Sequence, residues 1–407
     1  MSEAKCPIPS GLQLTALDPE FRENPSGPLA MLRSAEPVHK DRSFDRVVLT
    51  RAKDVAATLN DRTLSVDPRK SRPGSASWVQ FRVDKGFRPT MLHLDDPDHK
   101  RLRSLVAKAF NVQAIEAMRG RINEIANRLL NAVAGQTSFD VVEAYAKPLP
   151  TIVIATMLGV SESDQEHFKR WSDDRAHIFN PTRTPEQQEA VERSQEEFTN
   201  YLLKVIEERR KNRGSDLVSS LINVEEGGER LTVPEIVSTC HILLIAGNLT
   251  TTDLLSNGAL ILLQHPDQLA KIRQSPTLIH AAVEELLRHS PPVTQMERIP
   301  LDMHTIDGVT VEPGQTICNS LFAANHDPAL HADPEVFDIE RADKSHFSFG
   351  GGTHFCIGAP LARAEAQIGL WTLFERFPRL RLHPDRPPVR KSLPAFNGMA
   401  SLHVEVD

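Results

Sequence analysis

The feature that most constrains this chain is a long apolar segment from residue 232 to residue 264. It opens with the run Thr232-Val233-Pro234-Glu235, which has the form of a helix capping box with proline in the first turn. The dipeptide His265-Pro266 ends the pattern. At about 1.5 Å per residue, a helix of this length extends for roughly 50 Å, enough to cross a whole molecule. Because residues 242–247 are apolar nearly all round, we expect the middle of this helix to be buried.

Most of the remaining chain also shows the hydrophobic period of helices. The period is clearest in the stretches 113–135, 185–212 and 278–289. Short β-branched stretches within residues 34–66 and 301–320 predict a small sheet. The sequence contains no internal repeat and no linker long enough to mark a boundary. We therefore expect one mainly α domain with small β-sheets (α+β) over residues 1–407, with an irregular segment in about the first 20 residues.

The composition limits the classes of function. A chain of 407 residues with 40% hydrophobic and 25% charged residues is globular and can bury a cavity of cofactor size. A net charge of -7 without a dominant basic stretch argues against a nucleic-acid partner. Residues 1–9 lack the apolar region of a signal peptide, and no run of about twenty apolar residues occurs. We expect a cytoplasmic protein without a membrane anchor.

The four cysteines, Cys6, Cys240, Cys318 and Cys356, are far apart and include no C-x-x-C pair, which argues against a zinc site or a disulfide framework. Cys356 ends the run Phe349-Gly350-Gly351-Gly352-Thr353-His354-Phe355-Cys356, and the spacing is F-x-x-G-x-x-x-C-x-G. The glycines let the backbone fold tightly around the sulfur, with amide N–H groups directed at it. A lone cysteine is usually a small buried hydrophobic residue, but the whole pattern is typical of a haem-thiolate loop.

After the cysteine, the run Gly358-Ala359-Pro360 reads as the first turn of a helix. The positive end of that helix would favour the thiolate over the thiol. The loop resembles the haem loop of the cytochrome P-450 family. This resemblance implies haem b with Cys356 as the axial thiolate ligand of the iron. It also places four residues around the haem: Phe349, Gly350, His354 and Gly358.

Within the long predicted helix, the run Ala246-Gly247-Asn248-Leu249-Thr250-Thr251-Thr252 resembles the family's oxygen-binding groove. Glycine and consecutive threonines disfavour a helix, so the run suggests a kink or the close approach of something flat, although a helix contact through small residues is the alternative. The resemblance implies that Ala246 and Gly247 leave room for haem and dioxygen and that Thr250 delivers protons. Leu249 stands where the family usually has an acid, so Thr251 or Asn248 could share the proton relay.

Two further motifs occur in the family's order. Glu285 and Arg288 form an E-x-x-R pair on one helix face, a pattern that is common on solvated helices. With Arg341 the pair resembles the family's structural core network. Upstream, His99 and Arg103 share a helix face and have the spacing of two donors for a buried carboxylate. The resemblance implies that they bind the haem propionates together with Arg298 and His354.

The resemblance implies a triangular single-domain fold with the long helix over the haem, and a soluble monooxygenase of bacterial type. Such an enzyme inserts one oxygen atom of O2 into a small to medium hydrophobic substrate by hydroxylation or oxidative demethylation. Electrons would come from a separate ferredoxin and an NAD(P)H-dependent ferredoxin reductase, and the protein would be a monomer. Because of Leu249, a peroxide-driven peroxygenase stays open as an alternative, as does a haem carrier or sensor without turnover.

The substrate contacts follow from the resemblance alone. They would form a mainly apolar lining of Trp78, Phe81, Phe87, Leu243, Ala246, Val293, Thr294, Met296, Phe396 and Met399. Arg72, Arg82 or Arg88 could anchor an acidic substrate, although loop arginines are usually solvated.

Overall fold

A computed structural model describes residues 8–161, 164–180, 183–226 and 228–406, so part of the irregular N-terminus predicted for about residues 1–20 lies outside it. The chain forms two compact units, each assembled from segments far apart in sequence. Unit 1 comprises Met1–Arg88, Leu287–Phe355 and Arg390–Asn397. Unit 2 comprises Pro89–Leu286, Cys356–Val389 and Gly398–Asp407. The expectation of a single domain stays a prediction.

Unit 1 is built on a five-stranded sheet. The strand order is β1 (Val38–Asp41), β2 (Arg46–Leu49), β10 (Thr316–Ser320), β7 (Gln295–Pro300) and β3 (Leu64–Ser65). Strand β10 pairs parallel with β2 and antiparallel with β7, so it joins the first part of the chain to the later part. Strands β8 (His304–Ile306) and β9 (Val309–Val311) form a separate hairpin. These strands confirm the prediction from the β-branched stretches.

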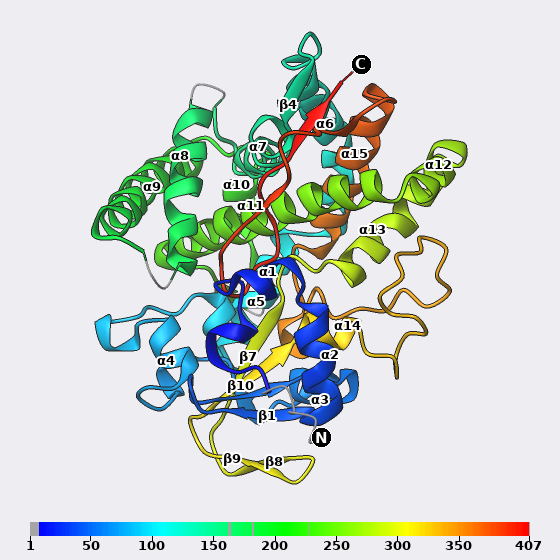
Figure 1. The fold of residues 1–407 in the computed structure, drawn as a ribbon. Helices are drawn as coiled ribbons and strands as arrows, with labels where there is room; N and C mark the ends of the chain where they lie inside the picture. The colour runs from blue at the N-terminus through cyan, green and yellow to red at the C-terminus, as the bar shows by residue number, and fades with distance from the viewer. Residues whose placement is uncertain (1–7, 162–163, 181–182, 227, 407) are drawn as a thin grey trace. The chain divides into compact units, whose positions relative to one another are not determined.

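Helices cover both faces of this sheet, namely α1 (Pro19–Glu23), α2 (Ser26–Ala35), α3 (Ala52–Asn60) and α14 (Leu321–Asn325). The short helix α4 (Ala76–Gln80) also belongs to unit 1 (Figure 1). Side chains alternate along a strand, so neighbouring residues of β2 enter different apolar clusters. Val47 packs with Val55 of α3, whereas Val48 packs with Leu32 of α2. Strand β2 is buried on both faces, which explains why its last three residues are apolar without alternation.

Unit 2 is a helical assembly around α11 (Val233–Gln264). Helix α11 packs against α7 (Pro148–Met157), α8 (Gln165–Ala176), α9 (Pro185–Lys211) and α15 (Ala359–Arg376), as Figure 1 shows. The predicted capping box is present, because the Thr232 N–H donates to Glu235 Oε2 at 2.7 Å. By length and composition α11 alone among the described helices could cross a membrane, but 61% of its apolar window is buried in the structure. It is a core helix, which confirms the predicted burial.

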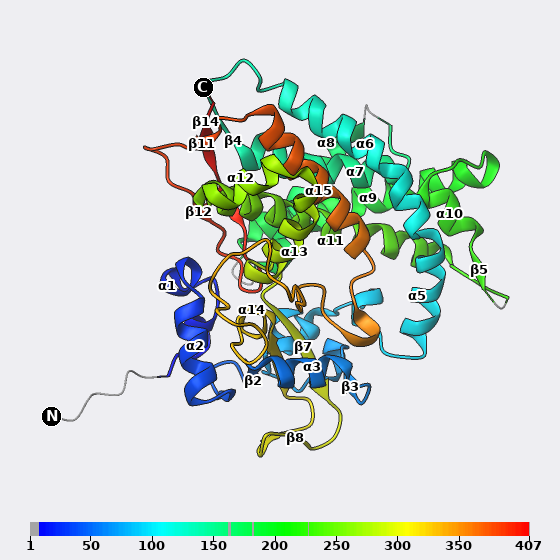
Figure 2. The same cartoon turned by 90° about the vertical axis from the view of Figure 1, so that its right-hand side faces the viewer.

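The other elements of unit 2 surround this core. They are α5 (Asp98–Ala109), α6 (Val112–Asn131), the π-helix η5 (Val142–Ala146), α10 (Leu217–Asn223), α12 (Pro266–Gln274) and α13 (Ile279–His289), whose last residues belong to unit 1. In Figure 2, α10 and the hairpin of β5 (Glu225–Glu226) and β6 (Glu229–Arg230) lie beside α5. Helices α6, α9, α11 and α13 confirm the helices predicted from hydrophobic period.

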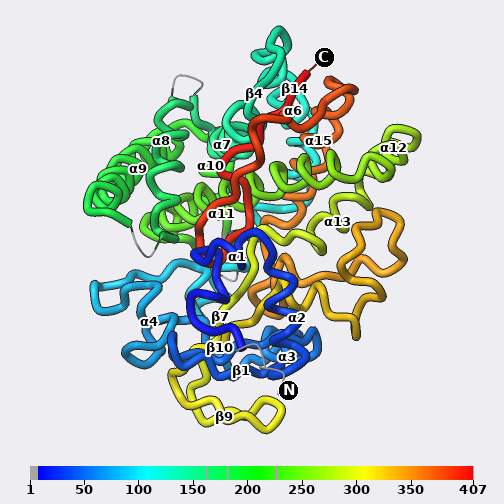
Figure 3. Tube along the Cα trace, in the orientation of Figure 1, coloured from blue at the N-terminus to red at the C-terminus, as the bar shows by residue number. Residues whose placement is uncertain are grey.

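Three short strands of unit 2 form a sheet in the order β11 (Arg381–Leu382), β14 (His403–Glu405) and β4 (Ser138–Asp140). Figure 3 shows that the last strand of the described chain runs beside β4, so the C-terminal segment is fixed to the middle of the chain. Strands β12 (Val389–Arg390) and β13 (Met399–Ser401) pair with each other and complete the described strands. The result is the predicted class, mainly helical with small sheets.

Candidate active site

The described cysteines differ sharply in accessibility. Cys240 and Cys318 are buried, and burial raises the pKa of Cys240 to about 12 and that of Cys318 to about 11. Cys318 lies in β10, where its Sγ donates to Gln295 Oε1 at 3.2 Å. Cys356 is exposed, and Cys6 lies outside the described residues. Among the described thiols, Cys356 is therefore the one that an incoming ligand can reach.

The surroundings of the Cys356 sulfur favour a thiolate once a cation is present. Cys356 is exposed as a residue, but the protein atoms around its sulfur reduce contact with water and raise the pKa of the thiol. The backbone N–H groups of Gly358 and Ala359 and the guanidinium of Arg103 lower that pKa. Helix α15 begins at Ala359 with proline in its first turn, as the sequence predicts. A coordinated metal ion deprotonates a thiol outright, so burial would not prevent ligation. This donor set fits an axial ligand of haem iron.

The glycines before the cysteine are required by close packing within unit 1. Gly350 and Gly352 have φ values of +71° and +63°, a conformation that strains other residues. A Cβ atom on Gly352 would lie 2.4 Å from the carbonyl oxygen of Leu59, at the end of α3. A Cβ atom on Gly350 would lie 2.8 Å from Met296 Sδ in β7. The loop is thus pressed against α3 and β7, with Phe349 buried in it.

One face of α11 is accessible in the middle of an otherwise buried helix. Ala246 is exposed and Thr250, one turn later, is half-buried. The Thr250 hydroxyl donates to the carbonyl oxygen of Ala246 at 2.7 Å. A small residue and a hydroxyl therefore share this face, and an apolar flat group could lie against Ala246.

The other candidates in this run point toward neighbouring helices. A Cβ atom on Gly247 would lie 3.1 Å from Ile154 Cδ1 of α7, so this glycine allows two helices to approach closely. Asn248 donates to the hydroxyl of Ser172 on α8, and Thr251 is buried. The structure thus brings Ala246 and Thr250 together on one face, whereas Gly247 faces α7, Asn248 faces α8 and Thr251 is buried.

The predicted propionate contacts are found as buried or half-buried side chains in each unit. In unit 2, His99 and Arg103 lie on α5, and burial lowers the pKa of both. The thiolate of Cys356 partly offsets this effect at Arg103. In unit 1, Arg298 is buried and donates to the carbonyl oxygen of Leu59 at 3.4 Å, while His354 ends a 3₁₀ turn of the glycine loop.

The predicted structural arginines hold irregular backbone. Arg288 is fully buried and donates to the carbonyl oxygens of Pro334 at 2.8 Å and Val336 at 3.2 Å. Arg341 donates to the same Val336 oxygen at 2.8 Å and to that of Ala332 at 2.6 Å. Glu285 is also fully buried on α13. Both guanidinium groups therefore fix the segment that precedes the glycine loop.

The residues predicted to contact substrate are partly grouped. In unit 1 the rings of Phe81 and Phe87 lie 5.3 Å apart, and Val293 forms an isolated β-bridge with Phe396. Of the other unit 1 candidates, Trp78, Thr294 and Met296 are half-buried. In unit 2, Leu243 and Met399 are buried. Arg72, one of the three loop arginines, is engaged with Asp45 at 2.6 Å and with Glu312.

A polar cluster between α8 and α11 was missed by the sequence reasoning. It contains Arg175 and His241, both buried. Arg175 belongs to a charged stretch that reads as a solvated helix face. Its spacing from Phe168, Trp171 and Ser172, which are also buried, was the available signal.

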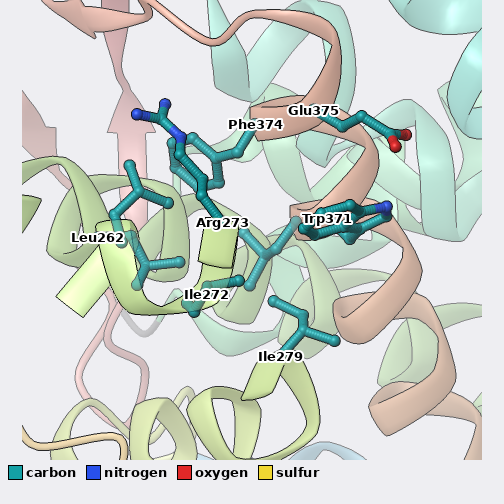
Figure 4. Close-up of a pocket in the computed structure, with 9 residues that line it drawn as sticks. Leu262, Ile272, Arg273, Ile279, Trp371, Phe374 and Glu375 are labelled. Atoms are coloured by element: carbon teal, nitrogen blue, oxygen red, sulfur yellow. The ribbon is translucent and has the colours of Figure 1, made fainter. Parts of the chain in front are cut away.

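A small cavity in unit 2 does not compete as a substrate site. It lies where α15 meets α11, α12 and α13, and Figure 4 shows it lined by Leu262, Ile272, Ile279 and Trp371 among others. Its volume is about 20 Å³. That is room for about one water molecule.

Comparisons with known proteins agree with this geometry. A family model described as "Cytochrome P450" matches residues 42–276 and 273–400. The polyketide biosynthesis cytochrome P450 PksS of Bacillus subtilis is 35% identical over 95% of this chain and 97% of its own length. Its solved structure has a TM-score of 0.87 and covers 96% of this chain and 99% of that one.

Two other proteins of the same family are also similar to this chain. The cytochrome P450 monooxygenase PikC of Streptomyces venezuelae is 39% identical over 92% of this chain and 89% of its own length. The structure of P450BioI in complex with an acyl carrier protein ligated to hexadec-9Z-enoic acid has a TM-score of 0.86 at 35% identity, covering 95% of this chain and 99% of that one.

Proposed function

The chain belongs to the cytochrome P450 family. From this premise we propose that Cys356 is the haem ligand and that the enzyme oxidises a small to medium hydrophobic substrate. Members of this family are monooxygenases with a cysteine thiolate on haem iron, and this chain is an oxidoreductase of that kind. The accessibility of Cys356, in contrast to buried Cys240 and Cys318, is the observation that supports the assignment of the ligand.

The haem, when bound, supplies the activation of dioxygen and the insertion of one oxygen atom into the substrate. Cys356 would hold its proximal side, where the N–H groups of Gly358 and Ala359 temper the charge of the sulfur. By the family resemblance, Arg103 and Arg298 would supply positive charge to the propionates, and His99 and His354 would donate hydrogen bonds to them. Charge-assisted donors of this kind suit buried carboxylates.

Thr250 is the residue that we assign to proton handling. Its hydroxyl donates to the Ala246 carbonyl and keeps its lone pairs available on the accessible face of α11. Leu249 cannot donate or accept a proton, and Asn248 is committed to Ser172. Thr251 is buried and makes a weaker candidate. Ala246 on the same face would leave room for the flat cofactor.

The remaining parts of the proposal rest on the family. A separate ferredoxin and an NAD(P)H-dependent reductase would supply electrons, and the enzyme would act in the cytoplasm as a monomer. The substrate lining named above is mainly apolar, which favours a hydrophobic natural product, hydroxylated or demethylated. A peroxide-driven peroxygenase is the second candidate because Leu249 replaces the usual acid. Faster turnover with peroxide alone than with reductase and ferredoxin would favour it.

The test of the ligand assignment is Cys356→His, with Cys318→Ala as the matched control. The expected result is loss of the thiolate signature from the reduced carbon monoxide complex of Cys356→His and its retention in Cys318→Ala. Total haem is measured separately as the pyridine haemochromogen, so that loss of haem is distinguished from a change of ligand. A thiolate signature that survives in Cys356→His would refute the assignment.

A further inference from the structure

Two packed helices of unit 2 bury nitrogen atoms for which the described residues provide no acceptor. Arg175 on α8 is 6% exposed, and its Nε and Nη1 atoms lack a hydrogen-bond partner among the described residues. His241 on α11 is 8% exposed, and its Nδ1 atom also lacks a hydrogen-bond partner among the described residues. Helices α8 and α11 pack against each other. Burial lowers the pKa of both groups, and the positive charge of Arg175 lowers the pKa of His241 further.

The acidic residues beside Arg175 are committed elsewhere. Asp173 accepts from Lys147 Nζ at 3.1 Å, and Asp174 accepts from the hydroxyl of Ser194 on α9. Burial lowers the pKa of Arg175, and no acidic residue of the described chain raises it again. The guanidinium therefore lacks an internal counter-ion among the described residues.

The groups around Arg175 are suited to an anion. His241 Nε2 lies 2.9 Å from the Thr199 hydroxyl of α9. If that hydroxyl donates, the neutral imidazole carries its proton on Nδ1 and becomes a donor. A guanidinium offers a planar fork that matches a carboxylate in bidentate fashion. Unpaired buried charges are costly, and buried polar groups without partners are rare in native proteins.

We propose that Arg175, assisted by His241, binds the carboxylate of an acidic substrate. This inference deepens the proposed function and rests on it, because it names the substrate class of the same enzyme. The loop arginine Arg72 is a poorer anchor, since it is already paired with Asp45 and Glu312. The buried pair on α8 and α11 takes that role instead.

The position of His241 on α11 also bears on where oxidation occurs. Helix α11 carries both His241 and Ala246. Because a helix rises about 1.5 Å per residue, the two lie roughly 7.5 Å apart along its axis. Thr250 lies one turn further on. A substrate held by its carboxylate at Arg175 would therefore be oxidised at a carbon well removed from the acid group.

The experiment measures binding to the haem-loaded enzyme by titration calorimetry. The probes are two acids with their neutral partners, dodecanoate with dodecan-1-ol and phenylacetate with phenylacetamide. We expect at least one acid to bind at least tenfold more tightly than its neutral partner. Arg175→Gln should abolish this preference, because glutamine retains polarity without charge, and Arg175→Lys should restore part of it.

The matched control is Arg170→Gln on the same helix. Arg170 pairs with Glu197 at the surface, so its loss should leave the preference for acids unchanged. Equal affinities of every acid and its neutral partner in the wild type, or a preference that survives in Arg175→Gln, would overturn the proposal. A purely structural arginine would instead lower the urea midpoint of Arg175→Gln and leave the preference intact.

The two proposals fail separately. Calorimetry needs no turnover, so the carboxylate site is tested even if the enzyme is inactive. If the reduced carbon monoxide complex of the wild type shows no thiolate signature, the assignment of Cys356 is refuted, and the binding result is unaffected. An enzyme with that signature that prefers neutral ligands would retain the proposed function and lose the carboxylate anchor.

Discussion

Replacing Gly352 by alanine should destabilise unit 1 through two separable effects. The φ value of +63° places a non-glycine residue in the left-handed region, which costs about 1–2 kcal/mol. The new Cβ atom would also lie 2.4 Å from the Leu59 carbonyl oxygen, which is backbone and cannot rotate away. Relief of such overpacking by shifts of the backbone typically costs about 1–3 kcal/mol. We expect a loss of about 2–5 kcal/mol in the free energy of unfolding.

Gly86→Ala separates the two effects. Gly86 also belongs to unit 1 and has a φ value of +81°, but a Cβ atom there would meet no atom within 4 Å. Only the conformational cost applies, about 1–2 kcal/mol. The difference between the two variants therefore measures the collision with Leu59.

The steric clash at Gly352 should also displace Arg298, a predicted haem contact. The Leu59 oxygen accepts a hydrogen bond from Arg298 Nη2, so a shift of this carbonyl would displace Arg298. The assay compares urea midpoints by circular dichroism and the haem content per chain. We expect Gly352→Ala to unfold at lower urea and to hold less haem than Gly86→Ala. Equal midpoints and equal haem content would refute the reasoning.

Two predictions concern single side chains of unit 2. Thr250→Ala should increase the peroxide released per NAD(P)H consumed, while Thr251→Val should not; unchanged coupling in Thr250→Ala would remove Thr250 from proton handling. Burial raises the pKa of Glu365 well above its usual value. Above about pH 4.3 the unfolded chain loses a proton that the folded state keeps, so the free energy of unfolding falls as pH rises. Glu365→Gln should match the wild type near pH 4 and become progressively more stable than it toward pH 8 in urea titrations; a difference independent of pH would contradict this.

The sequence was sufficient for the elements whose signals are local. Helix α11 followed from its capping box and apolar length, and α15 from the proline after Cys356. The strands of unit 1 followed from β-branched stretches, although the parallel pairing of β10 with β2 depends on contacts between distant segments. Local patterns do not specify which distant strand becomes a neighbour.

The candidate site was harder to predict because α11 is apolar nearly all round. Periodicity alone cannot tell which of its faces meets which neighbour, so Gly247 and Asn248 were grouped with Ala246 although they face α7 and α8. Arg175 was missed for a related reason. An arginine in a charged helix is usually solvated, and only tertiary packing turned this one inward.

The contacts of Arg288 and Arg341 also bear on which mutations the chain can tolerate. Both side chains bind backbone carbonyl oxygens between Ala332 and Val336, and every amino acid supplies the same oxygen. The side chains of this segment can therefore be exchanged without loss of its anchors, provided that the backbone path is kept. The two arginines have no such freedom. Library mutagenesis should thus find a permissive stretch held by two intolerant positions outside it, Arg288 on α13 and Arg341 shortly after Val336.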